Sequence, residues 1–345
     1  MRSQAAGVIS GQKQTRRQGF IRGTGLAVPE RVLTNADFEK MVDTSDEWIR
    51  DRSGIRERRI CADGENTADL AARAGSIALA DAGVEPIDVD VIILSTATQD
   101  HLLPSTACET QARLGAHRAA AFDVTAACAG WLYGVTIADG LLKTGVCGNA
   151  LVIGAEKMSA IIDYTDRSTC VLFGDGAGAA LLGPGGDLSD GGTGLLATHM
   201  QTDGRCAQML WRPAGGAAMP STPQTQSERL EFVKQEGRDV FKRAVLAMEE
   251  SSRIVLDKAG MTIDDIDLVV PHQANIRIIE SLAKRLGVDG DRVYINIDRY
   301  GNTSSASIPI ALDEVRRSEI VPPGGTVLMT AFGGGLAWGS AVLRL

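Results

Sequence analysis

Two pairs of sequence blocks, each separated by the same 177 residues, constrain the fold of this chain more than any other feature. The block at 82–93 resembles the block at 259–270, and the block at 148–153 resembles the block at 325–330. Each block passes from a helix end or a glycine turn into a short apolar strand, which is typical of α/β proteins with helix-covered sheets. Because both pairs keep one offset without a gap, we expect a duplicated fold made of two similar halves.

The length of the chain agrees with two halves. It has 345 residues, and single hydrophobic cores stop growing at roughly 250–300 residues. A stretch rich in glycine, proline and aspartate at 183–192 predicts the boundary, with an N-terminal half at 18–188 and a C-terminal half at 189–345. Residues 1–17 carry four basic and no acidic side chains and lack the apolar core of a signal peptide, so we expect a disordered basic tail. The stretch at 212–227 contains three prolines and predicts a long loop.

Composition excludes several classes of function. With 35 basic and 43 acidic residues the net charge is −8, the wrong sign for a general nucleic-acid-binding protein. No apolar run approaches the ~20 residues of a membrane-spanning helix. The six cysteines are scattered without a C-x-x-C pair, and the four histidines form no ligand cluster with them, which argues against a metal site. We therefore expect reduced thiols in a cytoplasmic protein that binds neither a membrane nor nucleic acid.

Two glycine-rich segments do not match a dinucleotide-binding loop. Gly23-Thr24-Gly25 is followed by Val28 where the third glycine of the G-x-G-x-x-G pattern belongs, and the glycines at 174–178 have the wrong spacing. A nicotinamide-dependent oxidoreductase is therefore disfavoured.

Cys128 is the first candidate for chemistry. A strand-like segment at 121–124 leads through small residues to an apolar segment at 131–142 with helical spacing, so Cys128 falls at the first turn of a buried helix. The positive end of a helix dipole stabilises a thiolate there, and small neighbours leave room for an incoming acyl group. A small buried thiol without a chemical role is the alternative interpretation.

The repeat relates His272 and Asn302 to the Cys128 region. His272 follows an apolar strand, at the carboxyl end where α/β sheets carry their active sites, and it corresponds to Ser95 in the first half. At the same offset Ser305 corresponds to Cys128, and Asn302 lies close to Ser305 in the sequence. Structural roles would explain a histidine or a turn asparagine taken singly. A Cys–His–Asn set at strand ends and helix starts explains the three residues together.

The glycines at 333–335 follow the last repeated strand. Glycine lets the backbone approach a ligand closely and direct N–H groups towards it, as an oxyanion hole requires. A flexible turn is the alternative interpretation.

Six motifs, several of which contain these candidates, occur in one order along residues 18–345. They are T-S-D-E-W-I at 44–49, A-A-C-A-G at 126–130, F-G-D-G-A-G at 173–178, P-H-Q-A-N at 271–275, G-N-T-S at 301–304 and F-G-G-G at 332–335. Together they resemble the thiolase-fold condensing enzymes, and most closely the β-ketoacyl-acyl-carrier-protein synthase III family. The resemblance implies an α/β subunit with a five-layered αβαβα fold of two pseudo-symmetric halves, usually in a homodimer.

The resemblance also implies roles at the reacting centre. Cys128 matches the acylated nucleophile, and His272 and Asn302 match the pair that binds the malonyl thioester carbonyl. The backbone N–H groups of Cys128 and Gly334 match the oxyanion hole. Leu103 takes a place in the acyl pocket where acetyl-initiating enzymes often carry phenylalanine, and a smaller or more flexible wall would admit longer or branched acyl groups.

Contacts with the two substrates are implied in the same way. Trp48 and Arg167 match side chains that sandwich the adenine of CoA, and Arg52 matches an arginine that contacts a phosphate or the base. A basic docking face for the acidic carrier protein is implied by three side chains, Arg277, Lys284 and Arg285. Such a face would steer the carrier despite the net charge of −8, whereas a merely solvated basic face is the alternative.

The implied activity is the decarboxylative Claisen condensation of an acyl-CoA primer with malonyl-acyl-carrier protein through an acyl-cysteine, which initiates fatty acid synthesis. The products are β-ketoacyl-carrier protein, CoA and CO2, and no cofactor is expected because the CoA thioester is a substrate. Asn302 argues against degradative thiolases, which use a second cysteine, and against elongating synthases with a Cys–His–His set. A specialised condensing or acyl-transfer enzyme of a natural-product pathway is the alternative within the fold. A non-catalytic acyl-CoA or carrier-protein binding subunit would be expected to lose the nucleophile.

Overall fold

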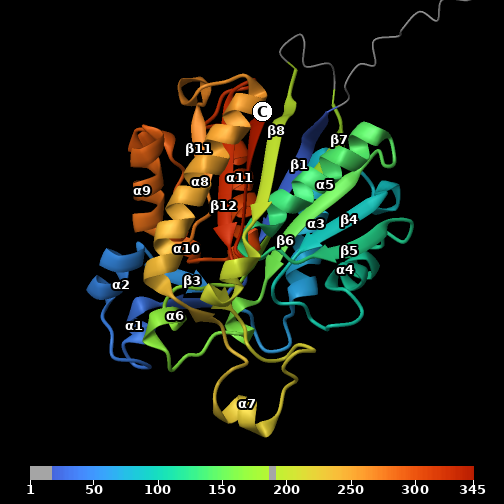
Figure 1. Cartoon of the computed structure of the whole chain (residues 1–345). Helices are drawn as coiled ribbons and strands as arrows, with labels where there is room; N and C mark the ends of the chain where they lie inside the picture. Colours follow the sequence, from blue (N-terminus) through green and yellow to red (C-terminus); the bar gives the residue numbers. More distant parts are fainter. Residues whose placement is uncertain (1–17, 186–191) are drawn as a thin grey trace, which may run out of the picture.

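The computed structural model describes residues 18–185 and 192–345. Two β-sheets pack face to face across a layer of helices, and further helices cover both outer faces (Figure 1). The tail predicted at 1–17 and the boundary predicted between residues 188 and 189 lie outside the described residues.

The first half forms a mixed sheet of five strands. Its order is β1 (Gly19–Ala27), β7 (Gly176–Pro184), β6 (Ala150–Glu156), β4 (Val91–Ser95) and β5 (Ala120–Val124). β4 pairs in parallel with both β5 and β6, whereas β7 pairs antiparallel with β6 and with β1. The carboxyl ends of β4, β5 and β6 therefore lie at the same end of the sheet.

The second half repeats this arrangement with four strands. Their order is β8 (Gly194–Thr202), β13 (Ala337–Arg344), β12 (Thr326–Gly333) and β11 (Leu268–Pro271). β11 and β12 are parallel, and β13 is antiparallel to its two neighbours, as β7 is in the first sheet. The order β8-β13-β12-β11 thus matches β1-β7-β6-β4, which confirms the duplication predicted from the constant offset.

One element of the first sheet has no full counterpart in the described part of the second half. Where β5 would recur, a single parallel bridge joins Val269 and Val293, and the chain then forms the short helix α10 (Ile297–Tyr300). The first sheet therefore ends in a complete edge strand, and the second does not.

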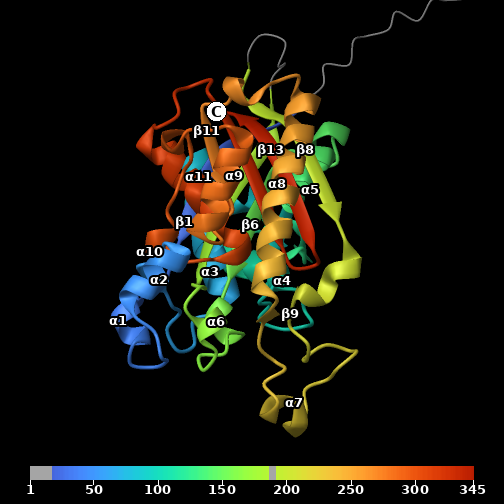
Figure 2. The ribbon, with the colours of Figure 1, turned by 60° about the vertical axis from the view of Figure 1, so that its left-hand side comes forward.

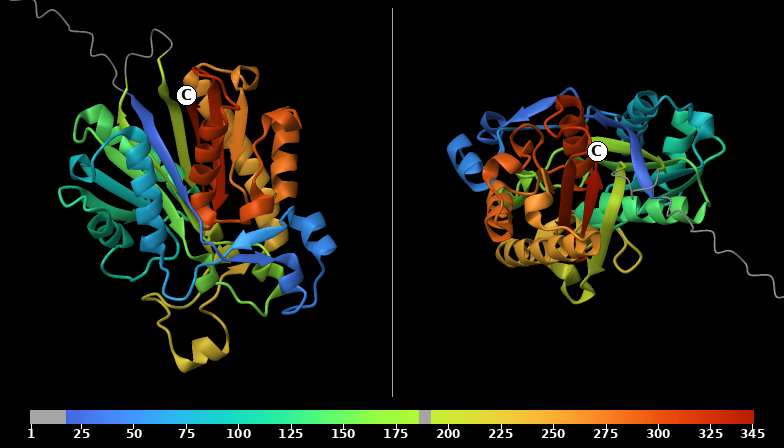
Figure 3. Two further views of the ribbon diagram at one scale, coloured as in Figure 1. Left: turned by 180° about the vertical axis from the view of Figure 1, so that it is seen from behind. Right: turned by 90° about the horizontal axis from the view of Figure 1, so that it is seen from above.

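The helices form three layers around the two sheets. The outer face of the first sheet is covered by α3 (Thr67–Ala82) and α4 (Thr106–Leu114), and that of the second by α8 (Gly237–Ala259) and α9 (Ile276–Leu286) (Figure 2). Between the sheets lie α5 (Gly130–Thr144) and α11 (Ser307–Ser318), as the views from behind and from above show (Figure 3). These layers confirm the expected five-layered αβαβα fold.

The side chains of β4 show how the sequence pattern produces the layers. Because successive side chains of a strand point to opposite faces, Ile92 and Leu94 pack with α3, whereas Val91 and Ile93 pack with the central helices. Both faces of β4 are buried, which explains why the strand is a continuous apolar run without alternating polar residues.

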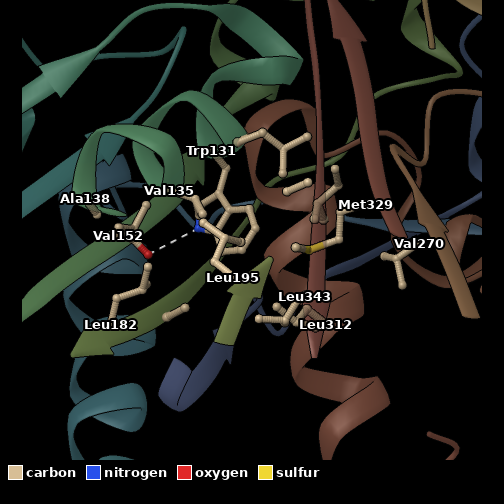
Figure 4. Packing of buried hydrophobic residues seen from close by; sticks show 14 of the residues in the cluster. Trp131, Val135, Ala138, Val152, Leu182, Leu195, Val270, Leu312, Met329 and Leu343 are labelled. Carbon is tan, nitrogen blue, oxygen red and sulfur yellow. Dashed lines mark hydrogen bonds between the residues drawn. The ribbon is translucent and has the colours of Figure 1, made fainter. Parts of the chain in front are cut away.

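The central core contains side chains from both halves (Figure 4). Trp131, near the start of α5, is buried and donates a hydrogen bond from Nε1 to the carbonyl of Val152 on β6 at 3.2 Å. Met329 on β12 and Leu312 on α11 belong to the same cluster. Their packing holds the first turn of α5, which follows Cys128, against both sheets.

The glycines at 174–178 have a packing role. A Cβ on Gly178 would lie 2.6 Å from the backbone nitrogen of Ile310, and one on Gly174 would clash with the carbonyl of Tyr300. Glycine at these positions lets α11 approach β7 closely, and lets the end of α10 approach the segment that leads into β7. This close packing explains the glycines at 174–178, whose spacing does not match a dinucleotide-binding loop.

Shorter elements lie at the end of the molecule where β4, β6, β11 and β12 terminate (Figure 1). Here α2 (Asp46–Ser53) from the first half packs beside α9 from the second half. The predicted long loop at 212–227 is irregular except for the short helix α7 (Pro223–Ser227), which begins at a capping Thr222. The remaining short elements are β2 (Val32–Thr34), α1 (Asn35–Phe38), β3 (Glu57–Arg59), α6 (Arg167–Cys170), β9 (Leu210–Trp211) and β10 (Lys234–Gln235).

Within residues 18–185 and 192–345, no helix combines the length and the apolar character needed to cross a membrane.

Candidate active site

Cys128 lies in a 3₁₀ turn, Ala127–Ala129, immediately before α5. The equivalent turn of the second half, Ser304–Ala306, precedes α11. The two turns face each other, because the thiol of Cys128 donates to the hydroxyl of Ser304 at an Sγ–Oγ distance of 3.5 Å. The correspondence of Ser305 with Cys128 in the repeat is thus a meeting of two equivalent turns in space.

His272 follows β11 and is buried beside the start of α11. Its backbone nitrogen donates to the carbonyl of Thr330, which fixes His272 at the end of the β11–β12 ladder. Its ring nitrogen Nδ1 is 2.6 Å from the hydroxyl of Ser307, so the ring is held by that side and Nε2 is left for a ligand. Burial lowers the pKa of His272 to about 3, and the imidazole is therefore neutral near pH 7.

Asn302 lies in the segment that leads into the second turn. Its side-chain oxygen Oδ1 accepts a hydrogen bond from the backbone nitrogen of Ser304 at 2.8 Å. Because that bond occupies the oxygen, the amide nitrogen Nδ2 is the group that Asn302 can offer to a ligand, as a donor. The backbone of Asn302 also bonds to Leu172 and Gly174, which ties this segment to the first half.

The glycine loop joins β12 to β13 and packs against the nucleophile turn. A Cβ on Gly333 would lie 2.5 Å from the backbone nitrogen of Cys128, so a side chain there would displace the turn. Gly334 and Gly335 line the same cavity as Cys128, and Gly335 has a φ of 138°. The loop therefore needs glycine both for close approach and for its backbone conformation.

One cavity brings the three predicted catalytic residues together. It has a volume of about 460 Å³ and is lined by Cys128, His272 and Asn302. Most of the remaining lining is apolar and includes Phe241 and Met248 of α8. A largely apolar cavity with a few converging polar groups is typical of sites for small molecules with an apolar part, such as an acyl chain.

The environment of Cys128 favours the thiol. Burial raises its pKa to about 12, the negative charge of Glu156 acts in the same direction, and the hydrogen bond with Ser304 opposes them. Burial and the charge of Glu156 thus oppose the thiolate that the start of a helix is expected to stabilise, and stabilisation by the helix dipole stays a prediction. A reaction at Cys128 needs a group that accepts its proton.

The three side chains predicted to contact CoA lie together on α2 and α6. The guanidinium carbon of Arg167 is 4.8 Å from the ring centroid of Trp48, and that of Arg52 is 5.3 Å from it. Two groups in van der Waals contact lie about 3.5–4 Å apart. A base stacked on both sides therefore needs about 7 Å between the ring of Trp48 and the guanidinium of Arg167. Arg167 must therefore move from the ring before an adenine can stack there.

The predicted docking face is less cationic than its sequence suggests. Arg277 donates to the carboxylate of Asp51 on α2 at 2.7 Å and to the carbonyl of the same residue at 3.0 Å. Arg285 forms an ion pair with Glu249 on α8. Lys284 and Arg285 lie in the last turn of α9, whereas Arg277 lies in its first turn, next to the helix that carries Trp48.

Leu103 does not line the cavity within this chain. It lies on the loop between β4 and α4, where Leu102 and Leu103 are 85% and 87% exposed. A role for Leu103 in the wall of an acyl pocket stays a prediction that would require a second chain.

Sequence reasoning missed several residues of the site. Ser304 is the offset partner of Ala127 and was noted only as the end of the G-N-T-S motif, whereas Glu156 ends the apolar strand β6 just outside the repeated block at 148–153. Phe241 and Met248 gave no signal of their own, because apolar residues on an amphipathic helix usually belong to the core.

Comparisons with known proteins assign the chain to a family. A family model described as 3-oxoacyl-(acyl-carrier-protein) synthase III matches residues 122–204, and the model of its C-terminal part matches residues 256–345. The chain is 53% identical over 324 residues to a β-ketoacyl-acyl-carrier-protein synthase III from Symbiobacterium thermophilum, which covers 94% of this chain and 97% of the relative.

Solved structures give the same result. A 3-oxoacyl-acyl-carrier-protein synthase III from Aquifex aeolicus matches with a TM-score of 0.87 at 46% identity, over 95% of this chain and 100% of that one. A priming β-ketosynthase from a polyketide biosynthetic pathway matches with a TM-score of 0.87 at 36% identity, over 96% of this chain and 97% of that one. On these similarities the chain belongs to the β-ketoacyl-acyl-carrier-protein synthase III family of condensing enzymes.

Proposed function

We propose that this enzyme condenses an acyl-CoA primer with malonyl-acyl-carrier protein, with loss of CO2, and so initiates fatty acid synthesis. The observation that carries the proposal is the convergence of Cys128, His272 and Asn302 on one largely apolar cavity. A non-catalytic binding subunit would have no use for a thiol held between two hydrogen-bonding turns.

In the first half-reaction Cys128 attacks the thioester carbonyl of the primer and becomes acylated. The attack turns the carbonyl oxygen into an oxyanion, which needs hydrogen-bond donors already in place. The backbone N–H groups of Cys128 and Gly334 are assigned to this oxyanion, because Gly333 brings the glycine loop against the Cys128 turn. The apolar lining then holds the acyl chain.

In the second half-reaction the malonyl thioester loses CO2, and the resulting enolate attacks the acyl-cysteine. The enolate oxygen is stabilised by donors rather than by a base. His272 is neutral and can donate from Nε2, and Asn302 can donate from Nδ2, because Ser307 and Ser304 occupy the other polar atom of each side chain. No step requires a cofactor, since the CoA thioester is itself a substrate.

The two substrates are assigned to neighbouring surfaces. Trp48, Arg52 and Arg167 bind the adenine end of CoA by stacking and charge. The acidic carrier protein docks on the α9 side, through Arg277, Lys284 and Arg285. The pairing of Arg277 with Asp51 links the two surfaces, because Asp51 belongs to the same helix as Trp48.

We assign the active form to a homodimer on the basis of two apolar features. β5 is the edge strand of the first sheet, and Phe122 on it is exposed, so a second copy can add to this edge. Leu102 and Leu103 form a second exposed apolar feature that a partner would cover. The proposed role of Leu103 in the acyl pocket depends on this dimer. Because the proposed substrates belong to the cell interior, we place the reaction in the cytoplasm.

A natural-product pathway is the second candidate, favoured by the similarity to the polyketide priming synthase. The identity to that enzyme is 36%, against 53% to the synthase from Symbiobacterium thermophilum, and this difference supports fatty acid synthesis.

The test measures CO2 release and product mass with malonyl-carrier protein and a panel of acyl-CoA primers that includes acetyl, branched and longer chains. One CO2 should be released for each β-ketoacyl-carrier protein formed, and Leu103→Phe should shift the preference towards short primers. Acyl transfer without CO2 release would contradict the proposed reaction, and an unchanged preference in Leu103→Phe would contradict the pocket assignment.

A further inference from the structure

Glu156 is a buried carboxyl group next to the active site, and the reaction described above does not use it. It is the last residue of β6 and is fully buried. Its side chain lies between the two halves, where it contacts the segment after β4 on one side and the second 3₁₀ turn on the other. An isolated buried carboxylate is costly, so a group held in this way calls for an explanation.

The surroundings of Glu156 are built for the ionised form. Its Oε2 accepts from the hydroxyl of Thr98 at 2.7 Å and from the backbone nitrogen of Ala97 at 3.0 Å. Thr98 itself accepts from the backbone nitrogen of Lys157, so its own proton is directed to the carboxylate. The other oxygen, Oε1, accepts from the hydroxyls of Ser304 at 3.0 Å and Ser305 at 2.8 Å. Burial nevertheless raises the pKa of Glu156 above its ordinary value, which makes it a better proton acceptor.

A continuous chain of hydrogen bonds joins Cys128 to this carboxylate. The Cys128 thiol donates to Ser304 Oγ at 3.5 Å, and Ser304 Oγ donates to Glu156 Oε1 at 3.0 Å. Ser304 lines the cavity, whereas Glu156 does not. The geometry points to a proton relay in which Ser304 carries the proton of the Cys128 thiol to Glu156 when Cys128 reacts.

The balance of charge favours this route over the alternatives. Releasing the Cys128 proton to solvent would place a second negative charge beside Glu156 in a buried site, whereas the relay moves one charge from Glu156 to the sulfur. His272 is a poor acceptor, because its burial opposes the imidazolium form. Two other charged groups nearby are directed elsewhere: Lys157 donates to the carbonyl of Glu65 at 2.7 Å, and Arg212 donates to the carbonyl of Glu231 at 2.7 Å.

The protons, bonds and charges of the relay balance over the whole proposed reaction. As Sγ of Cys128 bonds to the acyl carbon, its proton passes to Ser304 and the Ser304 proton passes to Glu156. The bond from the acyl carbon to the CoA sulfur breaks, and the CoA thiolate leaves with the electron pair and takes a proton from solvent. When the enolate later displaces Cys128, the leaving sulfur recovers its proton from Glu156 through Ser304. Glu156 acts through Ser304 and is a positioning and proton-holding residue.

The relay can be tested without any thioester, by alkylation of Cys128 with iodoacetamide. The rate is followed by peptide mass spectrometry from pH 6 to 10, with the exposed Cys108 in the same sample as the reference. In the native protein the rate should reach a plateau near neutral pH, because the proton moves within the site. In Glu156→Gln it should fall on the order of 10²-fold at pH 7 and rise about tenfold per pH unit.

Two serine variants form a matched pair. Ser304→Ala should reproduce the loss, because it breaks the chain while Glu156 stays in place. Ser305→Ala removes a hydrogen bond to the same carboxylate oxygen without touching the sulfur, and it should change the rate far less. If Glu156→Gln does not fold, as judged by circular dichroism, the serine pair decides the matter alone.

Three results would overturn the relay. Alkylation of Glu156→Gln at the native rate or faster would mean that the carboxylate merely repels a thiolate. Equal losses in the two serine variants would mean that Glu156 only holds the turns, and a native profile with no plateau would exclude internal transfer. The relay rests on Cys128 as the nucleophile of the proposed function, but the two fail separately. A native protein that shows the alkylation profile but is not acylated by acyl-CoA would refute the proposed function and leave the relay intact.

Discussion

Ala127 and Ser304, 177 residues apart, both hold a positive φ, of 44° and 48°, at the start of the two turns that face each other at the active site. Non-glycine residues rarely adopt this conformation, and each instance costs on the order of 1–3 kcal/mol. The two halves therefore share the same strained turn, although only the first carries a thiol in it. The surrounding hydrogen bonds, including those from Ser304 and Ser305 to Glu156, hold the second turn in place.

The two half-reactions should respond differently to loss of the enolate donors. His272→Ala and Asn302→Ala should each lower the rate of decarboxylative condensation on the order of 10²–10³-fold, because each removes one donor to the enolate oxygen. Self-acylation of Cys128 should change much less. Single-turnover assays with acyl-CoA alone and with both substrates separate the two steps. His199→Ala is the control, since His199 bonds to Ser251 away from the cavity. Equal losses of rate in both steps would mean that His272 and Asn302 assist Cys128 or stabilise the fold, and do not bind the enolate.

The adenine site can be tested with a substrate that lacks adenine. Trp48→Ala should raise KM for acyl-CoA by about 5- to 150-fold, because stacking of a base on an aromatic ring contributes ~1–3 kcal/mol. The KM for the acyl-pantetheine thioester, which has no base to stack, should stay near its native value. If Trp48→Ala raises KM for acyl-CoA and for the acyl-pantetheine thioester by the same factor, the Trp48 ring stabilises the fold and does not bind the adenine of CoA.

Carrier docking should depend on Arg277 in spite of its ion pair with Asp51. Arg277→Glu should raise KM for malonyl-carrier protein and weaken its dependence on salt, because a rim charge mainly affects association. Self-acylation from acyl-CoA should change little. Arg73→Glu is a matched control, because Arg73 has a similar exposure, 48% against 46%, and also pairs with a carboxylate. An effect of equal size in Arg73→Glu would mean that only net charge matters.

The contact between the halves near the active site should be sensitive to a single methyl group. Gly154 on β6 packs against the backbone of Ser305, where a Cβ would clash. Gly154→Ala should therefore lower the free energy of unfolding by about 1–3 kcal/mol in urea denaturation. A Cβ added to Gly140 on α5 would meet open space, so Gly140→Ala should be neutral or stabilising by up to ~1 kcal/mol. A neutral Gly154→Ala would contradict the close packing of the two halves.

Most of the strands and turns that could be predicted from the sequence followed from the repeat. The strands expected from the offset begin at Val91 and Leu268, and the turn with Cys128 has its counterpart at Ser304–Ala306. The missing counterpart of β5 could not be foreseen, because a repeat in two blocks says nothing of the segment between them. There the second half forms α10.

Contacts between distant segments limit prediction of the site. Asp51 neutralises Arg277 across 226 residues of sequence, so the charge of the α9 surface cannot be read from α9 alone. The pKa of Cys128 depends on burial, which only the packed cavity reveals. The exposure of Leu103 likewise follows from the path of its loop and not from its apolar character.

Acylation of Cys128 is the step on which the rest of the proposed reaction depends, and intact-protein mass spectrometry after incubation with acyl-CoA alone measures it. The native protein should gain one acyl mass, and peptide mapping should place it on Cys128. Cys128→Ala should gain none while keeping its fold by circular dichroism. An adduct that persists in Cys128→Ala, or that maps to Cys108 or Cys170 in the native protein, would contradict the account.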